Sequence, residues 1–136
     1  MLLTCVLLCA LGAGDAPAPA TAKTAEPQLH PLQVRMVERV NVERRRRGMR
    51  ALVIDRRLMR SASRHTRWMA RSQNLQHTSE GVAENIAMGQ QDSAQAVESW
   101  MDSPGHRANI LGSYSKVGAA AYQAADGTVY WCLQLL

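Results

Sequence analysis

The order of patterns along the chain predicts an α+β domain in which helices pack on a small antiparallel sheet. Three stretches with helical spacing of apolar residues come first, and two extended apolar stretches follow at the carboxyl end. Asp126-Gly127, between those two stretches, is a dipeptide typical of β-hairpin turns. At 136 residues the chain is long enough for one domain with a single hydrophobic core.

Residues 1–14 are predicted to be a secretory signal peptide, because an apolar run there ends in small residues. The run is too short for a membrane span, which needs about 20 apolar residues. Cys5 and Cys9 do not follow a small residue, so lipid attachment is not favoured. Residues 15–31 are rich in Ala, Pro and Thr and predict a flexible linker. We therefore expect a folded domain at residues 32–136 of a secreted or extracytoplasmic protein.

Apolar residues at helical spacing predict three helices, over residues 31–47, 56–72 and 92–102. Gly48 supplies a stop for the first helix. Asp55 and Asp92 are suited to cap the second and third helices. Ser103 and Pro104 can begin another helical turn, with Ser as the cap and Pro at the first position.

Four polar or reactive side chains fall on faces predicted to be buried. Asn41 and Arg44 project onto the edge of the apolar stripe of the first helix, so we expect them to hold neighbouring backbone groups. His65 lies among apolar neighbours of the second helix and is interpreted as a hydrogen-bonded core residue rather than a ligand. Cys132 is expected to be a buried small hydrophobe, because no basic residue beside it would lower its pKa.

Between the second and third helices the pattern breaks into polar and small residues. Residues 73–91 are therefore predicted to form a long irregular connection, and loops of this length are often functional. Beyond the third helix, residues 116–122 and 128–135 are predicted to pair as two strands.

The formal net charge of +5 comes from arginine, since only Lys23 and Lys116 are lysines. A helical wheel puts five arginines of the second helix on one stripe: Arg56, Arg60, Arg64, Arg67 and Arg71. Such a stripe could attract an anionic polymer or surface, although a solvated outer face is the simpler explanation. No aromatic residue is assigned to the stripe and an export signal precedes it, so nucleic-acid binding is not expected.

Outside the main apolar runs, four residues could share one polar pocket: His77, Glu84, Asn85 and His106. Two neutral imidazoles and a carboxylate, from His77, His106 and Glu84, are plausible ligands for zinc. No His-x-x-x-His spacing fixes their directions, so a metal-free site is an equal alternative. In that alternative Glu84 accepts a hydrogen bond from one imidazole and raises its pKa. A pocket that serves only folding is the third alternative.

Ser103 lies beside this set and completes the predicted binding pocket. A Ser-His-Glu arrangement of Ser103, His106 and Glu84 could act as a nucleophilic site. A helix cap is the better explanation for a serine at this position. We therefore expect binding rather than catalysis, with a metal-dependent hydrolase built on His77, Glu84 and His106 as the alternative.

The segments resemble, in the same order, those of the CAP superfamily: cysteine-rich secretory proteins, antigen 5 and pathogenesis-related-1 proteins. The bacterial secreted SCP-like branch is the most similar. Three segments carry the resemblance: residues 41–48 (Asn-x-x-Arg-x-x-x-Gly), 84–87 (Glu-Asn-Ile-Ala) and 100–111, with Ser-Pro-Gly-His-Arg at its centre. It covers residues 32–136 and implies an α-β-α sandwich in which His77, Glu84 and His106 face one cavity. Ser103 stands where animal members have a second carboxylate.

The resemblance also implies a partner class. CAP domains are associated with lipids, sterols and cell-surface components, so we expect an extracytoplasmic ligand that is a lipid, an envelope component or an anionic polymer. A divalent metal such as zinc is the one cofactor considered. A monomer without a transmembrane helix is expected.

Overall fold

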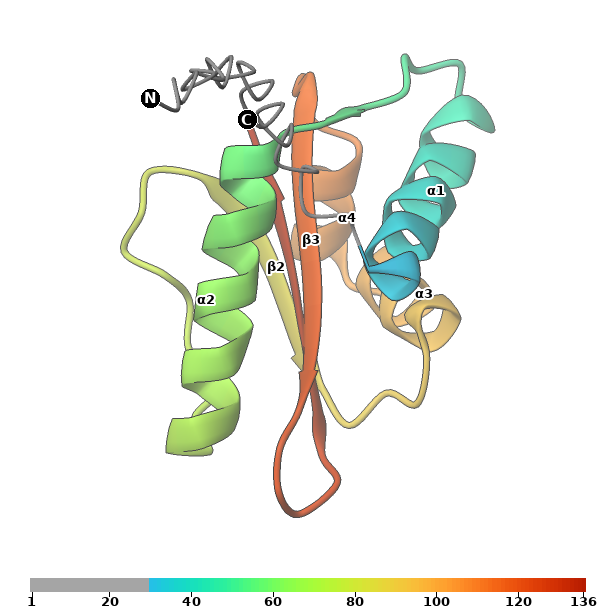
Figure 1. Cartoon of the computed structure of the whole chain (residues 1–136). Helices are drawn as coiled ribbons and strands as arrows, with labels where there is room; N and C mark the ends of the chain where they lie inside the picture. Colours follow the sequence, from blue (N-terminus) through green and yellow to red (C-terminus); the bar gives the residue numbers. More distant parts are fainter. Residues whose placement is uncertain (1–29) are drawn as a thin grey trace, which may run out of the picture.

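The computed structural model describes residues 30–136, which form four helices and four strands (Figure 1). In chain order these are α1 Pro31–Arg45, β1 Val53–Ile54, α2 Arg56–Ser72, β2 Ala83–Met88, α3 Ser93–Asp102, α4 Pro104–Ile110, β3 Lys116–Gln123 and β4 Val129–Leu135. The predicted signal peptide and nearly all of the predicted linker lie outside the described residues and stay predictions. Within the described residues, no helix has both the length and the apolar character needed to cross a membrane.

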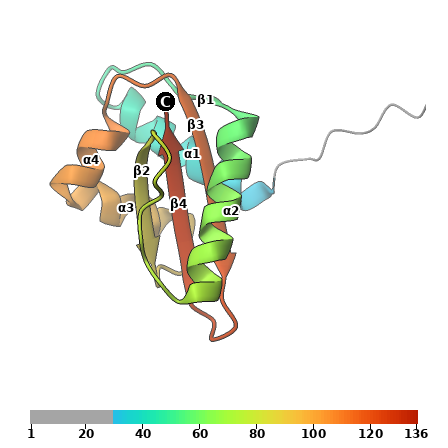
Figure 2. The same ribbon diagram turned by 90° about the vertical axis from the view of Figure 1, so that its left-hand side faces the viewer.

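The four strands form one sheet in the order β1-β3-β4-β2, with β2 at an edge. Helix α2 covers one face, and α1, α3 and α4 lie on the other. The three layers are seen edge-on in Figure 1, whereas Figure 2 shows the sheet face-on with α2 in front of it. This confirms the α+β class and the α-β-α sandwich. The sheet is mixed rather than purely antiparallel, because β1 runs parallel to β3 while the other pairs are antiparallel. A long crossover through α2, β2, α3 and α4 makes the parallel pair possible.

Strand β2 is an element that the sequence did not predict. Ala83–Met88 falls inside the expected irregular connection over residues 73–91, yet it pairs with β4 along its whole length. The strand begins with Glu84 and Asn85 side chains that are buried and hydrogen-bonded. Their polarity suggested a loop, whereas long-range hydrogen bonds make them suitable for a buried strand.

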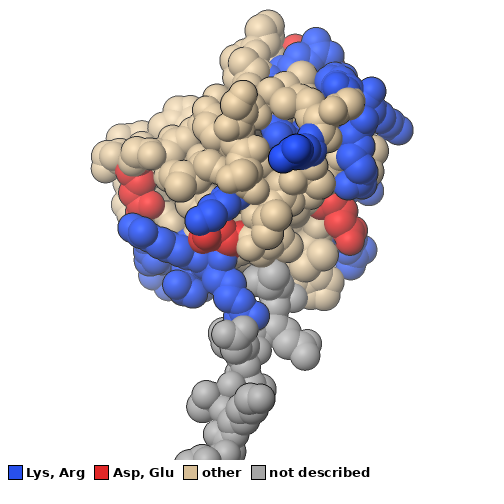
Figure 3. Space-filling view, turned by 90° about the horizontal axis from the view of Figure 1, so that it is seen from above, with Lys and Arg blue, Asp and Glu red and all other residues tan. Residues whose placement is uncertain are grey.

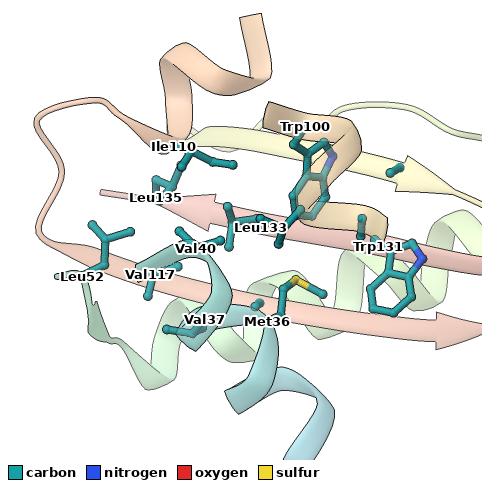
Figure 4. Packing of buried hydrophobic residues seen from close by; sticks show 14 of the residues in the cluster. Met36, Val37, Val40, Leu52, Trp100, Ile110, Val117, Trp131, Leu133 and Leu135 are labelled. Carbon is teal, nitrogen blue, oxygen red and sulfur yellow. The ribbon is translucent and has the colours of Figure 1, made fainter. Parts of the chain in front are cut away.

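The main core lies between the sheet and helices α1, α3 and α4 (Figure 4). Trp100 and Trp131, which are 1% and 0% exposed, are its largest members. Their indole N–H groups donate to the carbonyls of Ile86 and Gln90, so neither is left unsatisfied. A smaller cluster under α2 contains Cys132, which is free and buried as predicted.

The helix ends follow the predicted capping residues. Oδ1 of Asp55 accepts hydrogen bonds from the amides of Arg57 and Leu58 and so caps α2. Asp92 caps α3 in the same way. Gly48 follows α1 with a φ of 72°, a left-handed conformation that suits glycine.

Two buried polar residues of α1 hold backbone groups, as predicted. The Asn41 amide exchanges two hydrogen bonds with the backbone of Leu52, at 3.0 and 2.7 Å. Arg44 is 2% exposed, and its guanidinium donates to four backbone carbonyls. These carbonyls belong to Arg50, Ile110, Gly112 and Tyr114. Arg44 therefore ties the end of α1 to the chain that follows α4.

Candidate functional site

The buried carboxylate of Glu84 is the centre of the candidate site. Its side chain is 3% exposed on the edge strand β2. Oε1 accepts hydrogen bonds from Nδ1 of His77 at 2.9 Å and from the amide of Thr78 at 3.0 Å. Oε2 accepts one from Nε2 of Gln134 at 3.0 Å, and the Cys132 thiol donates weakly to it at 3.4 Å. These contacts hold the carboxylate in one orientation.

His77 belongs to the irregular connection between α2 and β2, and its side chain is 59% exposed. Glu80 fastens this connection to α2, where it accepts from the Ser61 hydroxyl at 2.7 Å and pairs with Arg64 at 3.5 Å. An ionised carboxylate can only accept, so Nδ1 of His77 carries the proton donated to Glu84. Nε2 has no hydrogen-bond partner among the described residues and is available to a ligand.

His65 is a member of this cluster that the sequence analysis did not assign to the site. Its Nε2 lies 2.8 Å from the carbonyl oxygen of Gln76 and 3.8 Å from Oε1 of Glu84. Because a carbonyl can only accept, Nε2 carries the proton. The helical spacing correctly predicted an inward-facing side chain. The sequence did not reveal that Glu84, 19 positions later in the chain, would lie next to it.

His106 lies in the first turn of α4 and is half-buried. Ser103 occupies the N-cap position, as predicted, but its side chain makes no capping hydrogen bond. The hydroxyl instead lies 3.0 Å from Nδ1 of His106. The prediction that the Ser103 side chain caps α4 was therefore wrong. Its hydroxyl holds the imidazole of His106 instead.

Asn85 faces the opposite side of the sheet from Glu84, because successive residues of a strand alternate. Its Nδ2 donates to the carbonyl of His106 at 2.9 Å. Asn109 donates to Oδ1 of Asn85 at 2.9 Å and to the carbonyl of Glu84 at 3.2 Å. These amides dock α4 against β2. Asn85 thus positions His106 and, being fully buried, does not line an open pocket.

The electrostatics of the site favour a charged carboxylate beside an uncharged imidazole. Burial opposes ionisation of Glu84, but hydrogen bonds from Gln134, Thr78 and His77 outweigh it and lower the pKa of the carboxyl group. Burial, and then the nearby charge of His77, lower the pKa of His106. At neutral pH we therefore expect Glu84 to be ionised and His106 to be neutral.

The predicted site residues meet as two pairs: His77 with Glu84, and Ser103 with His106. Within residues 30–136 no hydrogen bond or ion pair joins the two pairs. In the same region, no group of three or more His, Cys, Asp or Glu is arranged to hold a metal ion. Both oxygens of Glu84 accept hydrogen bonds here, and a three-ligand zinc set of His77, Glu84 and His106 stays a prediction.

The two pKa shifts predict that acid destabilises the fold in two steps. The lowered pKa of His106 means that the unfolded chain takes up its proton first, so stability falls as the pH drops below about 6.5. The lowered pKa of Glu84 gives stability that is complete above about 4.3 and is lost as the pH falls through the folded-state value. Urea unfolding across this pH range should show both steps.

Two variants test which residue causes each step in the pH dependence of stability. His106→Gln should abolish the difference in stability that begins near pH 6.5. Glu84→Gln should reduce the loss at lower pH without abolishing it, because other carboxyl groups, such as those of Asp55 and Asp92, also have a lowered pKa. Glu84→Gln should also cost about 1–3 kcal/mol at neutral pH, because an amide NH2 would face existing donors. If the unfolding free energy of either variant fell with pH in parallel with the wild type, the assignment would be wrong.

Comparison with known proteins identifies the family. The profile of "CAP: Cysteine-rich secretory protein family" matches residues 37–135, which is most of the chain. The chain belongs to the CAP family. The protein YkwD of Bacillus subtilis, itself uncharacterised, is 30% identical over 80% of this chain. The chain spans about half of that relative's length, 52%.

Solved CAP structures have the same fold. An outer surface protein of Borrelia burgdorferi gives a TM-score of 0.68 at 17% identity, over 75% of this chain and 89% of that one. An extracellular SCP-domain protein of Bacillus anthracis gives 0.64 at 20% identity, over 80% of this chain and 45% of that one. These likenesses concern the fold alone. Membership of the CAP family supports an extracellular, SCP-like protein.

Proposed function

We propose that this CAP domain is a non-enzymatic, extracytoplasmic binding module whose ligand contacts His77 and His106 beside the edge strand β2. The observation that carries the proposal is that Glu84 is buried while its hydrogen-bond partner His77 is exposed. The carboxylate is buried and fully hydrogen-bonded, whereas the imidazole that it orients is 59% exposed. Glu84 thus holds His77 in place, and His77 meets the ligand.

The arrangement argues against hydrolysis by a nucleophilic serine. Ser103 and His106 are at hydrogen-bonding distance, and the lowered pKa of His106 suits a base. A triad also needs a carboxylate that orients the base. Glu84 is bound to His77 instead of His106, so that third member is missing. In the metal-dependent alternative, Glu84 would have to exchange hydrogen bonds that it now accepts for a bond to the metal.

The test compares the double variant His77→Gln/His106→Gln with the wild type and with His30→Asn. His30 lies outside the site and caps α1, and Asn at this position can also cap a helix. Binding to purified peptidoglycan sacculi and to vesicles of uncharged phosphatidylcholine is measured by sedimentation. We expect the wild type to bind at least one of these probes. The double variant should bind the same probe about tenfold more weakly, because it loses one or two hydrogen bonds to the ligand.

Equal binding by the double variant and the wild type, or no binding of either probe by the wild type, would contradict the proposal. Turnover of a model ester that disappears in Ser103→Ala would show an enzyme instead. Stoichiometric zinc in protein purified without chelator, lost in the double histidine variant, would restore the metal alternative.

A further inference from the structure

The outer face of α2 is strongly basic. The helix, Arg56–Ser72, contains six arginines and no acidic residue. It is the helix that covers its face of the sheet alone, with α1, α3 and α4 on the other side. In Figure 3 the basic side chains gather in two areas on opposite sides of the molecule, and the one at the lower left lies over α2. This face can therefore approach a flat partner without obstruction from another helix.

An exposed tryptophan lies within this basic face, which corrects the expectation that no aromatic residue accompanies the arginine stripe. Trp68 is 46% exposed, whereas Trp100 and Trp131 are buried. One side of the Trp68 ring stacks on His65, with centroids 5.7 Å apart and planes at 11°. A hollow of about 460 Å³ beside it is lined by Arg64, Arg67, Trp68, Arg71 and Ser72.

The arginines of this face are only partly neutralised. Arg64 pairs with Glu80 at 3.5 Å, and both side chains are largely exposed. Arg67 lies over the ring of Tyr122, at 5.6 Å from its centroid, a contact with no acidic partner. Within the described residues, Arg60 and Arg71 form no ion pair. The face thus presents several uncompensated guanidinium groups around a fixed indole.

We propose that the outer face of α2 binds the surface of an anionic phospholipid bilayer, with Trp68 entering the headgroup region. Guanidinium groups bind phosphate through two parallel hydrogen bonds, and indoles are enriched where a membrane meets water. Leu75, which is 40% exposed, adds apolar surface near Trp68. The two are close because the carbonyl of Gln76, the residue after Leu75, is hydrogen-bonded to His65, and His65 stacks on Trp68. A soluble polyanion would use the arginines but would have no need for the exposed indole.

The structure favours a bilayer over single-stranded nucleic acid. A strand of bases stacks on several aromatic rings in a row. This face offers Trp68, and His65 already covers one side of its ring. His77 and His106, the residues proposed above to contact the ligand, are unchanged in all variants below.

The first measurement uses Trp68 as its own reporter. Because Trp100 and Trp131 are buried, a change in tryptophan emission on adding vesicles reports mainly on Trp68. With vesicles of phosphatidylglycerol and phosphatidylcholine we expect a blue shift and protection from a water-soluble quencher. With pure phosphatidylcholine, or in high salt, we expect neither. Absence of the shift with the anionic vesicles would overturn the proposal.

The second measurement compares variants by vesicle sedimentation. Arg67→Gln/Arg71→Gln should bind anionic vesicles about 25-fold more weakly, at about fivefold for each arginine. Arg35→Gln/Arg45→Gln removes the same charge from exposed positions of α1 on the other side of the sheet and should stay within about twofold. Equal losses in the two variants would show a net-charge effect and overturn the proposal.

A third variant separates a bilayer from a soluble polyanion. Trp68→Ala should weaken vesicle binding about fivefold, because roughly half of the side chain is available for burial. Binding to heparin, a soluble polyanion, should be unchanged. Equal vesicle affinity of Trp68→Ala and wild type would overturn the proposal and identify the face as a general polyanion site. Melting temperatures confirm that each variant is folded.

Discussion

Replacing Arg44 by Met is expected to lower the free energy of unfolding by about 3–5 kcal/mol, because four backbone carbonyls lose a charged donor. Met keeps much of the apolar stem but has no N–H donors. Four carbonyls that now accept from the guanidinium would be left without that donor in the interior. For a domain of this size the melting temperature should fall by about 15–30 °C.

Two further variants test this interpretation of Arg44. Arg44→Lys keeps the charge but replaces a planar fork by one ammonium group, so it should recover only part of the loss. Arg45→Met changes the exposed neighbour on the same helix and should alter the unfolding free energy by less than about 0.5 kcal/mol. If Arg44→Met unfolded at the temperature of Arg45→Met, the carbonyl contacts would be unimportant for stability.

The Arg44 contacts also connect stability to the site. Two of the four carbonyls, those of Ile110 and Gly112, lie at and just beyond the end of α4, the short helix that carries His106. Helix α4 is also held against β2, by Asn85 at the carbonyl of His106 and by Asn109 next to Ile110. Loosening the first anchor should let α4 shift, which an altered NMR titration of the His106 ring would reveal.

Local signals were sufficient for much of the fold. The ends of α2 were predicted from Asp55 and from the apolar period, and the C-terminal hairpin from Asp126-Gly127. The carbonyl-holding roles of Asn41 and Arg44 were predicted because they lie on the edge of an apolar stripe. Each of these inferences depends on residues near one another in the chain, where spacing alone carries the information.

The candidate site depends on residues far apart in the chain, and there the sequence was less informative. Glu84 and Asn85 suggested a loop because the partners that make them suitable for a strand, Gln134 and Asn109, are 50 and 24 positions away. Ser103 suggested a cap, but His106 competes for its hydroxyl. The pairing of His77 with Glu84 was among the alternatives considered, whereas the place of His65 beside them was not.

Substituting Gly118 by alanine is the second change with a large expected effect. A methyl group there would lie 2.5 Å from both the Cβ and the carbonyl oxygen of Leu58, and closer still to its carbonyl carbon. These are mainly backbone atoms of α2, which cannot rotate away, so the helix would have to move off the sheet. We expect a loss of more than about 4 kcal/mol, or failure to fold, measured by thermal unfolding monitored by circular dichroism.

Gly81→Ala is the matched control, because a methyl group at Gly81 meets nothing within 4 Å and the residue has no left-handed backbone conformation. It should melt close to the wild type. A folded Gly118→Ala with a similar melting temperature would mean that α2 can shift without cost. The close approach at Gly118 also matters for the site, since α2 carries both His65, 3.8 Å from Glu84, and Ser61, which anchors the His77 connection through Glu80. A folded variant in which α2 had moved should therefore show a smaller lowering of the pKa of Glu84.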